Sequence, residues 1–350
     1  MGANQDIRAA LAEQVSQAYG DKTALRINAG NSKTFYGNTV SGRELDVNQH
    51  CGIIDYHPSE LVITARAGTR LDEIEKTLKE NNQMLAFEPP RHSKNTTFGG
   101  SIATGLSGPR RAYSGSARDF VLGTQIINGK GEVLKFGGQV MKNVAGYDAS
   151  RLMVGAQGTL GILLDISVKV LPIPESELTI ALDMNESDSH ETLHRWIKQG
   201  HPITASCHYK NTLYVRLSST QNSVNQALKD IGGESCDSDL WVNLRNQTHE
   251  FFNQDSLWRL SLPTACDPIK TDDTQLIEWS GAQRWVISAE DLYDTASQNR
   301  GHATRYIING EPIRDCFQPL AQSILALHKR LKHSFDPAGI LNPGRTYTEL

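Results

Sequence analysis

The sequence predicts an α+β protein of two domains, in which a small α+β cap is inserted into a larger domain. A chain of 350 residues with 38% apolar and 21% charged residues is long enough to build two cores. Short β-branched runs alternate with amphipathic helical patterns along the chain. Glycine-rich loops are frequent before about residue 176 and disappear after it. We therefore expect domains at 1–175 and 176–310, with 311–350 returning to the first domain.

The part of the chain before residue 99 is predicted to hold two helices and several strands. The first helix stops at Gly20 and repeats apolar residues at helical spacing: Ile7, Leu11, Val15 and Ala18. Residues 71–82 form the second helix, because their apolar side chains share one face. β-branched runs bounded by Gly, Asn or Pro predict strands at 22–27, 43–47, 52–56, 60–68 and 83–87.

A hairpin, a short helix and a long strand are expected between residues 120 and 175. The dipeptide Asn128-Gly129 separates two β runs, which is a strong hairpin signal. Residues 147–155 look helical, and we interpret 142–148 as structural support with Asp148 as the helix cap. The β run at 158–174 then ends in two prolines.

The cap is predicted to alternate strands and helices, and a last helix is expected at 319–335. Its strands are expected at 178–183, 203–209, 212–218, 257–262 and 283–288. Its helices are expected at 189–199, 222–231 and 289–299.

Composition narrows the class of partner. The formal charge of -4, without a long Lys/Arg run, argues against a nucleic acid or a polybasic membrane surface. The N-terminus has no apolar signal core, and no stretch is long and apolar enough to span a membrane. Five scattered cysteines without a C-x-x-C pair suit a reducing compartment and cannot hold an iron–sulfur cluster. We therefore expect a cytoplasmic protein that binds a small molecule or another protein.

Two glycine-containing segments are candidate ligand sites. Residues 99–119 hold five glycines and three arginines but little apolar surface, so a bound ligand is the expected compensation. A floppy surface loop is the alternative, although Phe98, Ile102 and Leu106 share one helical face. The turn Gly30-Asn31-Ser32-Lys33 follows a β run and forms either an anion-binding nest or only a tight turn. The usual Rossmann and P-loop glycine signatures are absent.

Several motifs in a fixed order resemble the FAD-binding domain of the vanillyl-alcohol oxidase and p-cresol methylhydroxylase (PCMH) family. After the turn at Gly30 they read ELVITARAGTRLDEIEKTL, FEPP, TFGGSIATGLSG, YSGSARDFVLGTQIINGKGEVL, GTLGILLDISVKVLPIP and FDPAGILNPGR. The likeness covers about residues 20–175 and 311–350. It implies a two-subdomain PCMH-type FAD-binding domain carrying the small inserted cap. Within the family, the stretches GPRRAYSGS, VMKNVAGYDASRLMVG and GHATR are similar to FAD-binding subunits of bacterial glycolate oxidases.

The resemblance implies a set of cofactor-binding residues. Two glycine segments would hold the pyrophosphate, a third group would lie against the flavin, and backbone near residue 160 would line the adenosine and ring edge. The C-terminal segment would approach the ring with one asparagine. In that order the residues are Gly30, Asn31, Ser32, Gly99, Gly100, Ser101; Pro90, Gly105, Gly108; Gly158, Thr159, Gly161, Ile162; and Asn342.

The resemblance also implies a function within a complex. It implies oxidation of glycolate and related 2-hydroxy acids to 2-oxo acids, together with a catalytic flavoprotein subunit and an iron–sulfur subunit. Any attachment to the inner membrane would be made through those partners. The first glycine turn carries Asn31-Ser32-Lys33 where covalently flavinylated members often place a histidine, so noncovalent FAD is expected. The chain also lacks the HGH-like motif of self-contained 2-hydroxy-acid dehydrogenases, which puts an independent substrate site in doubt.

Four basic residues are candidates for catalysis. Oxidation of a 2-hydroxy acid needs a cation for the carboxylate and a base for the hydroxyl proton. Arg110 and Arg111 flank the presumed flavin loop, and His302 and Arg305 lie in the strand that returns toward the FAD domain. The alternative is that the arginines bind FAD phosphate or a partner, and that His302 is a packed strand residue.

Three rival functions stay open at the level of sequence. The chain could be a self-sufficient FAD-dependent 2-hydroxy-acid dehydrogenase or a scaffold that holds FAD only for structure. His190-Glu191-Thr192-Leu193-His194 matches the H-E-x-x-H pattern of zinc hydrolases. Ile197 and Gly200 stand where the extended zinc motif needs glycine and histidine, so we interpret this stretch as a solvated helix face and expect no metal.

Overall fold

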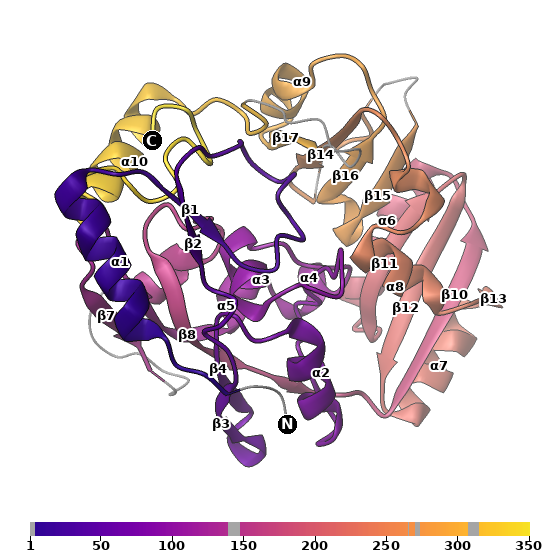
Figure 1. Cartoon of the computed structure of the whole chain (residues 1–350). Coiled ribbons are helices and arrows are strands. Elements are labelled where there is room, and N and C mark those ends of the chain that lie inside the picture. Colours follow the sequence, from indigo (N-terminus) through magenta and orange to yellow (C-terminus); the bar gives the residue numbers. More distant parts are fainter. Residues whose placement is uncertain (1–3, 139–147, 265, 270–273, 307–314) are drawn as a thin grey trace.

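The computed structural model describes residues 4–138, 148–264, 266–269, 274–306 and 315–350. These residues form a five-stranded sheet, an eight-stranded sheet and two short strand pairs (Figure 1). The strands of the eight-stranded sheet all come from residues 176–306, which we call the cap. The domain limits themselves stay a prediction, and the limit at 310/311 lies outside the described residues.

The chain begins with helix α1 (Arg8–Asp21), which buries the predicted apolar face. Gly20 does not end it: the helix continues to Asp21, and Lys22 adopts the left-handed conformation at its C-terminus. Strands β1 (Leu25–Asn28) and β2 (Arg43–Asp46) then pair in parallel. The C-terminal segment joins β1 on its other edge, where the backbone of Leu341 pairs with that of Leu25.

The five-stranded sheet has the order β3-β4-β8-β6-β7 and is antiparallel throughout. The strands are β3 (Ile53–His57), β4 (Val62–Arg66), β6 (Val121–Ile127), β7 (Val133–Gly137) and β8 (Ile162–Lys169). The predicted β6–β7 hairpin is confirmed, but the loop is longer than the dipeptide suggests, because the backbone N–H of Asn128 donates to Glu132 O. Gly131, with φ +85°, takes the left-handed position that the signal had indicated for Gly129.

Short elements connect this sheet to its surroundings. Helix α2 (Leu71–Lys79) buries its predicted face, and β5 (Gln83–Met84) pairs with β9 (Leu171–Pro172). The residues 98–120 form three short helices, and the predicted helix near Asp148 is a 3₁₀ turn. They are α3 (Phe98–Thr104), α4 (Arg111–Ser114), α5 (Ala117–Phe120) and η2 (Ala149–Met153). A further 3₁₀ turn, η1 (Pro58–Glu60), lies between β3 and β4.

Asp148 occupies the N-cap position of η2 but does not cap it. Its carboxylate instead accepts a hydrogen bond from Ser150 and pairs with Arg151 at 2.8 Å. The other residues of the predicted supporting stretch, 142–147, lie outside the described residues.

The eight-stranded sheet has the order β13-β10-β12-β11-β15-β16-β14-β17. Strands β10 (Ser176–Asp183), β11 (Ile203–Tyr209), β12 (Thr212–Ser219), β14 (Leu257–Ser261) and β16 (Gln283–Val286) correspond to the predicted runs. Strands β13 (Glu234–Ser235), β15 (Gln275–Glu278) and β17 (His302–Tyr306) complete the sheet. The helical elements are α6 (Glu186–Lys198), α7 (Gln221–Ile231), α8 (Asp239–Asn246), η3 (Glu250–Phe252), η4 (Trp279–Gly281), α9 (Tyr293–Gln298) and, after the cap, α10 (Gln322–Phe335).

The two faces of this sheet have different surroundings. On one face α6, α7 and α9 cover apolar residues of the strands. On the other face a second apolar cluster joins cap residues such as Trp285 and Tyr306 to Tyr36 and Leu106 of the N-terminal part. Side chains on this second face therefore lie between the cap and the rest of the molecule, and we call it the inner face.

Candidate functional site

A cavity of about 420 Å³ lies where the predicted glycine turns meet. Its walls come from the turn after β1, the start of α3, the turn before β8 and the C-terminal segment. Most of the predicted cofactor residues line it: Gly30, Asn31, Ser32, Gly99, Gly100, Gly158, Gly161, Ile162 and Asn342.

The turn after β1 exposes an unusual set of hydrogen-bond donors. Within the described part of the chain, the backbone N–H groups of residues 30–33 donate to no protein acceptor. Asn31 has φ +51°, so the turn alternates conformations as an anion-binding nest does. Unpaired donors in a cavity wall fit the diphosphate of a dinucleotide. The donors of residues 30–33 therefore fit the diphosphate of FAD.

Side chains at Gly30 and Gly99 would collide with neighbouring protein segments. A Cβ on Gly30 would lie 1.6 Å from Asn95 O, and one on Gly99 would lie 2.5 Å from the Cβ of Ala67. The missing side chains therefore let two segments of protein come together. The cofactor would meet the backbone of the turns that this packing creates.

Five predicted cofactor residues do not line the main cavity. Pro90 and Gly108 line a second cavity of about 20 Å³ against the inner face of the cap. Gly105 ends α3 in the left-handed conformation. Ser101 donates its hydroxyl to Thr97 O, and Thr159 donates to Ala156 O. Their roles toward a cofactor stay predictions.

The C-terminal segment shapes the cavity through two residues. The Asn342 side chain accepts from Ile27 N and donates to Gln157 O, both at 2.8 Å. The Arg345 guanidinium donates to four carbonyl oxygens of residues 33–38 at 2.7–3.3 Å and so holds the turn after β1. Sequence reasoning missed Arg345, although it ends the NPGR motif that carries Asn342.

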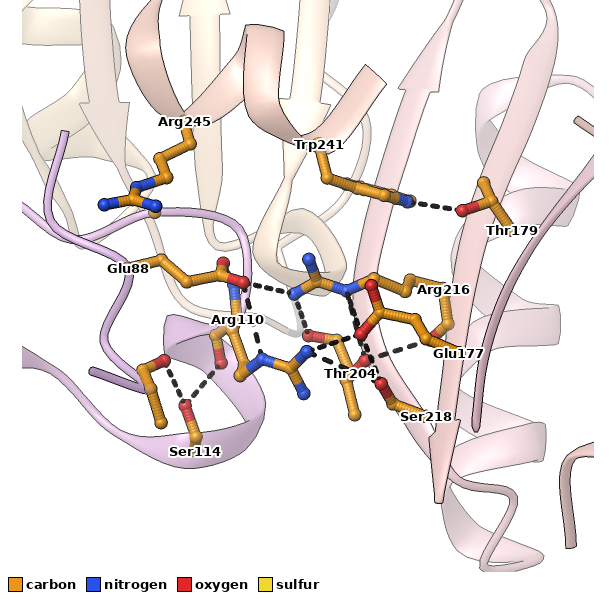
Figure 2. A network of polar contacts seen from close by, with 12 residues as sticks. Glu88, Arg110, Ser114, Glu177, Thr179, Thr204, Arg216, Ser218, Trp241 and Arg245 are labelled. Carbon is orange, nitrogen blue, oxygen red and sulfur yellow. Dashed lines mark hydrogen bonds and ion pairs between the residues drawn. The ribbon is translucent and has the colours of Figure 1, made fainter. Parts of the chain in front are cut away.

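The buried Arg110 lies in an ion-pair network with a second arginine and two carboxylates (Figure 2). Its guanidinium donates to Glu177 Oε2 at 2.7 Å and pairs with Glu88 at 3.4 Å. Arg216 pairs with Glu88 at 2.9 Å, and burial lowers the pKa of this arginine. Two arginines thus face two carboxylates that join the loop before α4 to strands β10 and β12 of the cap. Both carboxylate partners of Arg110 therefore belong to the protein, and its catalytic role stays a prediction.

Arg111 and His302 face the same region, and Arg259 joins them. The Arg111 guanidinium lies 4.4 Å from the centre of the Trp279 ring. Arg259 pairs with Thr304 across β14 and β17, which puts His302, two residues before Thr304, on the same inner face. In the described residues, none of these three basic side chains has a carboxylate partner in an ion pair. Sequence reasoning missed Arg259, because only the strand register brings it beside His302.

Charge and burial act together on this cluster. Burial lowers the pKa of His302, and the nearby positive charges of Arg259 and Arg111 lower it further. Burial, and then Arg259, also lower the pKa of Arg111. Both effects favour the neutral form of the His302 imidazole, which can accept a proton.

Arg305 lies on the opposite face of the cap sheet. It pairs with Trp258 of β14, and Trp258 belongs to the apolar cluster under α9. Because successive side chains of a strand alternate between faces, residues three apart cannot share one. His302 and Arg305 therefore lie on opposite faces of the cap sheet.

The H-E-x-x-H motif lies on α6 as a packed helix turn. The ring centroids of His190 and His194 lie 4.3 Å apart with the ring planes tilted by 56°, and Thr192 and Leu193 are buried. Among the described residues, no group of three or more His, Cys, Asp or Glu side chains could hold a metal ion. Nor does any described helix have the length and apolar character that a membrane span requires.

Comparisons with known proteins show the kind of domain and the relatives of the chain. Residues 7–137 match the family model described as FAD binding domain. Over 349 residues the chain is 47% identical to the glycolate oxidase subunit GlcE of Escherichia coli (strain K12), covering 99% of both chains. It is 35% identical over 129 residues to the glycolate oxidase subunit GlcD of Bacillus subtilis (strain 168), which is 37% of this chain and 27% of that one.

Solved structures confirm the fold class. p-Cresol methylhydroxylase with substrate bound has a TM-score of 0.73 at 15% identity, over 99% of this chain and 88% of that one. Alkyldihydroxyacetonephosphate synthase has a TM-score of 0.66 at 12% identity, over 97% and 75%. The mixed helix and sheet architecture is thus that of PCMH-type FAD-binding proteins.

Proposed function

Because the chain belongs to the family of the glycolate oxidase subunit GlcE and carries an FAD-binding domain, we propose that it is the FAD-binding subunit of a glycolate-oxidising complex. In this proposal it works with a catalytic flavoprotein subunit and an iron–sulfur subunit, and it oxidises glycolate and related 2-hydroxy acids to 2-oxo acids. The observation that carries the proposal is the identity over the whole chain, cap included. Because the match to GlcE covers the whole chain, it includes the residues of the inner face of the cap.

The cofactor of this proposal is noncovalent FAD in the main cavity. The nest of residues 30–33 would hold the diphosphate, and Gly158, Gly161 and Ile162 would line the adenosine end. The residues of the nest offer no histidine for a covalent bond. When bound, FAD would supply the acceptor for the hydride of the substrate C2–H bond.

The substrate part of the proposal uses the inner-face cluster. Arg111 and Arg259 would bind the carboxylate of the 2-hydroxy acid, because both guanidinium groups lack a carboxylate partner among the described residues. His302 would take the hydroxyl proton, since its lowered pKa favours the neutral imidazole. Arg110 stays with the interdomain network and Arg305 with the far face.

An absorbance spectrum of the pure protein tests the cofactor. We expect flavin absorption in the folded protein, and flavin that passes an ultrafiltration membrane after denaturation. Flavin that stays with the denatured chain would contradict noncovalent binding. A colourless folded protein that takes up no FAD would contradict the whole proposal.

Activity separates the complex from its rivals. We expect glycolate to reduce an artificial acceptor only when the flavoprotein and iron–sulfur subunits are added. Turnover by the single chain would instead identify a self-sufficient dehydrogenase. Flavin in this chain that the complete complex and glycolate cannot reduce would identify a scaffold.

A further inference from the structure

Of the basic residues that line the main cavity, Lys33 is the one whose charged group has no hydrogen-bond or ion-pair partner among the described residues. Three basic side chains line this cavity. Arg26 pairs with Glu44 at 2.9 Å, and Arg345 donates to backbone carbonyls and to Gln157 Oε1. The ammonium of Lys33 makes no hydrogen bond or ion pair with a described residue, although only 7% of the residue is exposed.

A buried ammonium without an anion is unfavourable, so its presence needs a reason. The side chains that face it add positive charge or none. Arg245 of α8, itself paired with Glu75, contributes to lowering the pKa of Lys33 to about 8, after desolvation. Arg345 donates to the Lys33 carbonyl. Burial and the Lys33 charge lower the pKa of His92 to about 4, and the Nε2 of His92 has no partner.

The position of Lys33 in the turn after β1 indicates which anion it binds. Lys33 is the last residue of the nest, and the free N–H groups of residues 30–33 line the same cavity. We propose that Lys33 is the cation that binds the diphosphate of FAD in the main cavity, beside the backbone nest of residues 30–33. This inference rests on the proposed function.

The inference predicts opposite effects of one substitution on stability and on binding. Lys33→Met keeps the length of the side chain and removes the charge. In the flavin-free protein, it removes an uncompensated buried charge, so thermal unfolding shifts to a higher temperature. FAD binding weakens by at least about tenfold, the range for a lost hydrogen bond to a charged group. If the Lys33 side chain only packed against its neighbours, the substitution would lower both the unfolding temperature and the affinity for FAD.

Isothermal titration calorimetry of the flavin-free full chain tests this with three probes. FAD and ADP carry the diphosphate, whereas riboflavin carries the flavin without phosphate. We expect Lys33→Met to weaken FAD and ADP alike and to leave riboflavin unchanged, and Lys33→Arg to retain most of the affinity. Lys130→Met, at an exposed position of the β6–β7 loop, is the control for the loss of one positive charge.

The pH dependence of FAD binding gives a second readout. A bound anion raises the pKa of Lys33, so the protonated form binds more tightly. The Kd for FAD in the wild-type protein should therefore rise between pH 7 and pH 9, as the free protein loses this proton. This rise should be absent from Lys33→Met and present in the control.

The outcomes distinguish this inference from the proposed function. If the wild-type chain binds neither FAD nor ADP, the proposed function fails with it. If the wild type binds FAD and Lys33→Met binds it equally well, only the inference is overturned. Loss of affinity for FAD and riboflavin with unchanged ADP binding also overturns it, because the charge would then meet the flavin.

Discussion

At the scale of single residues, Glu278 shows how burial sets a protonation state. Its carboxylate is buried on the inner face of the cap and accepts hydrogen bonds from Trp285 Nε1 at 2.8 Å and Gln283 Nε2 at 3.0 Å. Both bonds end on Oε2, and Oε1 has no partner. Desolvation outweighs these bonds and raises the pKa to about 7. The side chain therefore changes charge close to neutral pH.

The raised pKa of Glu278 predicts a pH-dependent effect of Glu278→Gln. Between the unfolded value of 4.5 and the folded value of about 7, the folded protein binds more protons, so this group reduces stability as pH rises. Relative to the wild type, the variant should be near neutral at pH 5 and gain about 2–3 kcal/mol by pH 8. Urea unfolding at both pH values measures this. An equal effect at both values would contradict the raised pKa.

Arg259→Gln is predicted to weaken substrate binding. The variant removes one of the two guanidinium groups proposed for the carboxylate, so KM for glycolate in the complete complex should rise about 10- to 100-fold. Steady-state kinetics with purified partner subunits measures this. Arg305→Gln, on the far face of the same sheet, is the control and should leave KM unchanged. Equal effects of the two variants would rule out an inner-face substrate site.

At the scale of elements, the turn after β1 is held by two contacts. The Asn95 carbonyl packs against Gly30, and Arg345 binds carbonyl groups of residues 33–38. These contacts leave the N–H groups of residues 30–33 available. The cavity is therefore a product of how these segments pack.

Two glycine-to-alanine variants should separate packing from intrinsic helix propensity. Gly30→Ala puts a methyl group where Asn95 O lies 1.6 Å away, so the turn must shift and stability should fall by about 1–3 kcal/mol or more. Gly20→Ala, inside α1 with no atom within 4 Å of its Cβ, should gain about 0.5–1 kcal/mol. Urea unfolding of both variants measures the difference. Loss of stability in both would contradict this assignment.

At the scale of the whole molecule, the ion-pair network around the buried Arg110 and Arg216 joins the cap to the N-terminal part. Arg110 and Glu88 come from one side, and Arg216 and Glu177 from the other (Figure 2). The Ser218 hydroxyl also donates to Glu177 Oε2 at 2.5 Å. The network balances two positive charges against two negative ones, so each member is needed to compensate the rest.

Arg110→Met should therefore destabilise the protein. It leaves the largely buried Glu88 and the partly exposed Glu177 with one arginine, so stability should fall by about 1–3 kcal/mol, less than for a fully buried pair. Differential scanning calorimetry should show a lower unfolding temperature than in Arg26→Gln, which breaks only the exposed Arg26–Glu44 pair. Equal unfolding temperatures in the two variants would show that the network contributes little to stability.

Local patterns in the sequence determined the elements and the glycine turns. The apolar spacing of α1 and α2, the β6–β7 hairpin and the order of the motifs are readable because each depends on residues close in the chain. The same locality explains why most predicted cofactor residues line one cavity: their motifs mark turns, and the family resemblance supplied the convergence of those turns.

The tertiary structure alone decided which charges are free. Arg110 and Arg111 are neighbours in the sequence, yet the first is neutralised by Glu88 and Glu177 and the second is not. Strand register put Arg259 beside His302 and turned Arg305 away. Whether a charged side chain is paired depends on residues that can lie more than a hundred positions away, and such pairing leaves no periodic trace in the sequence.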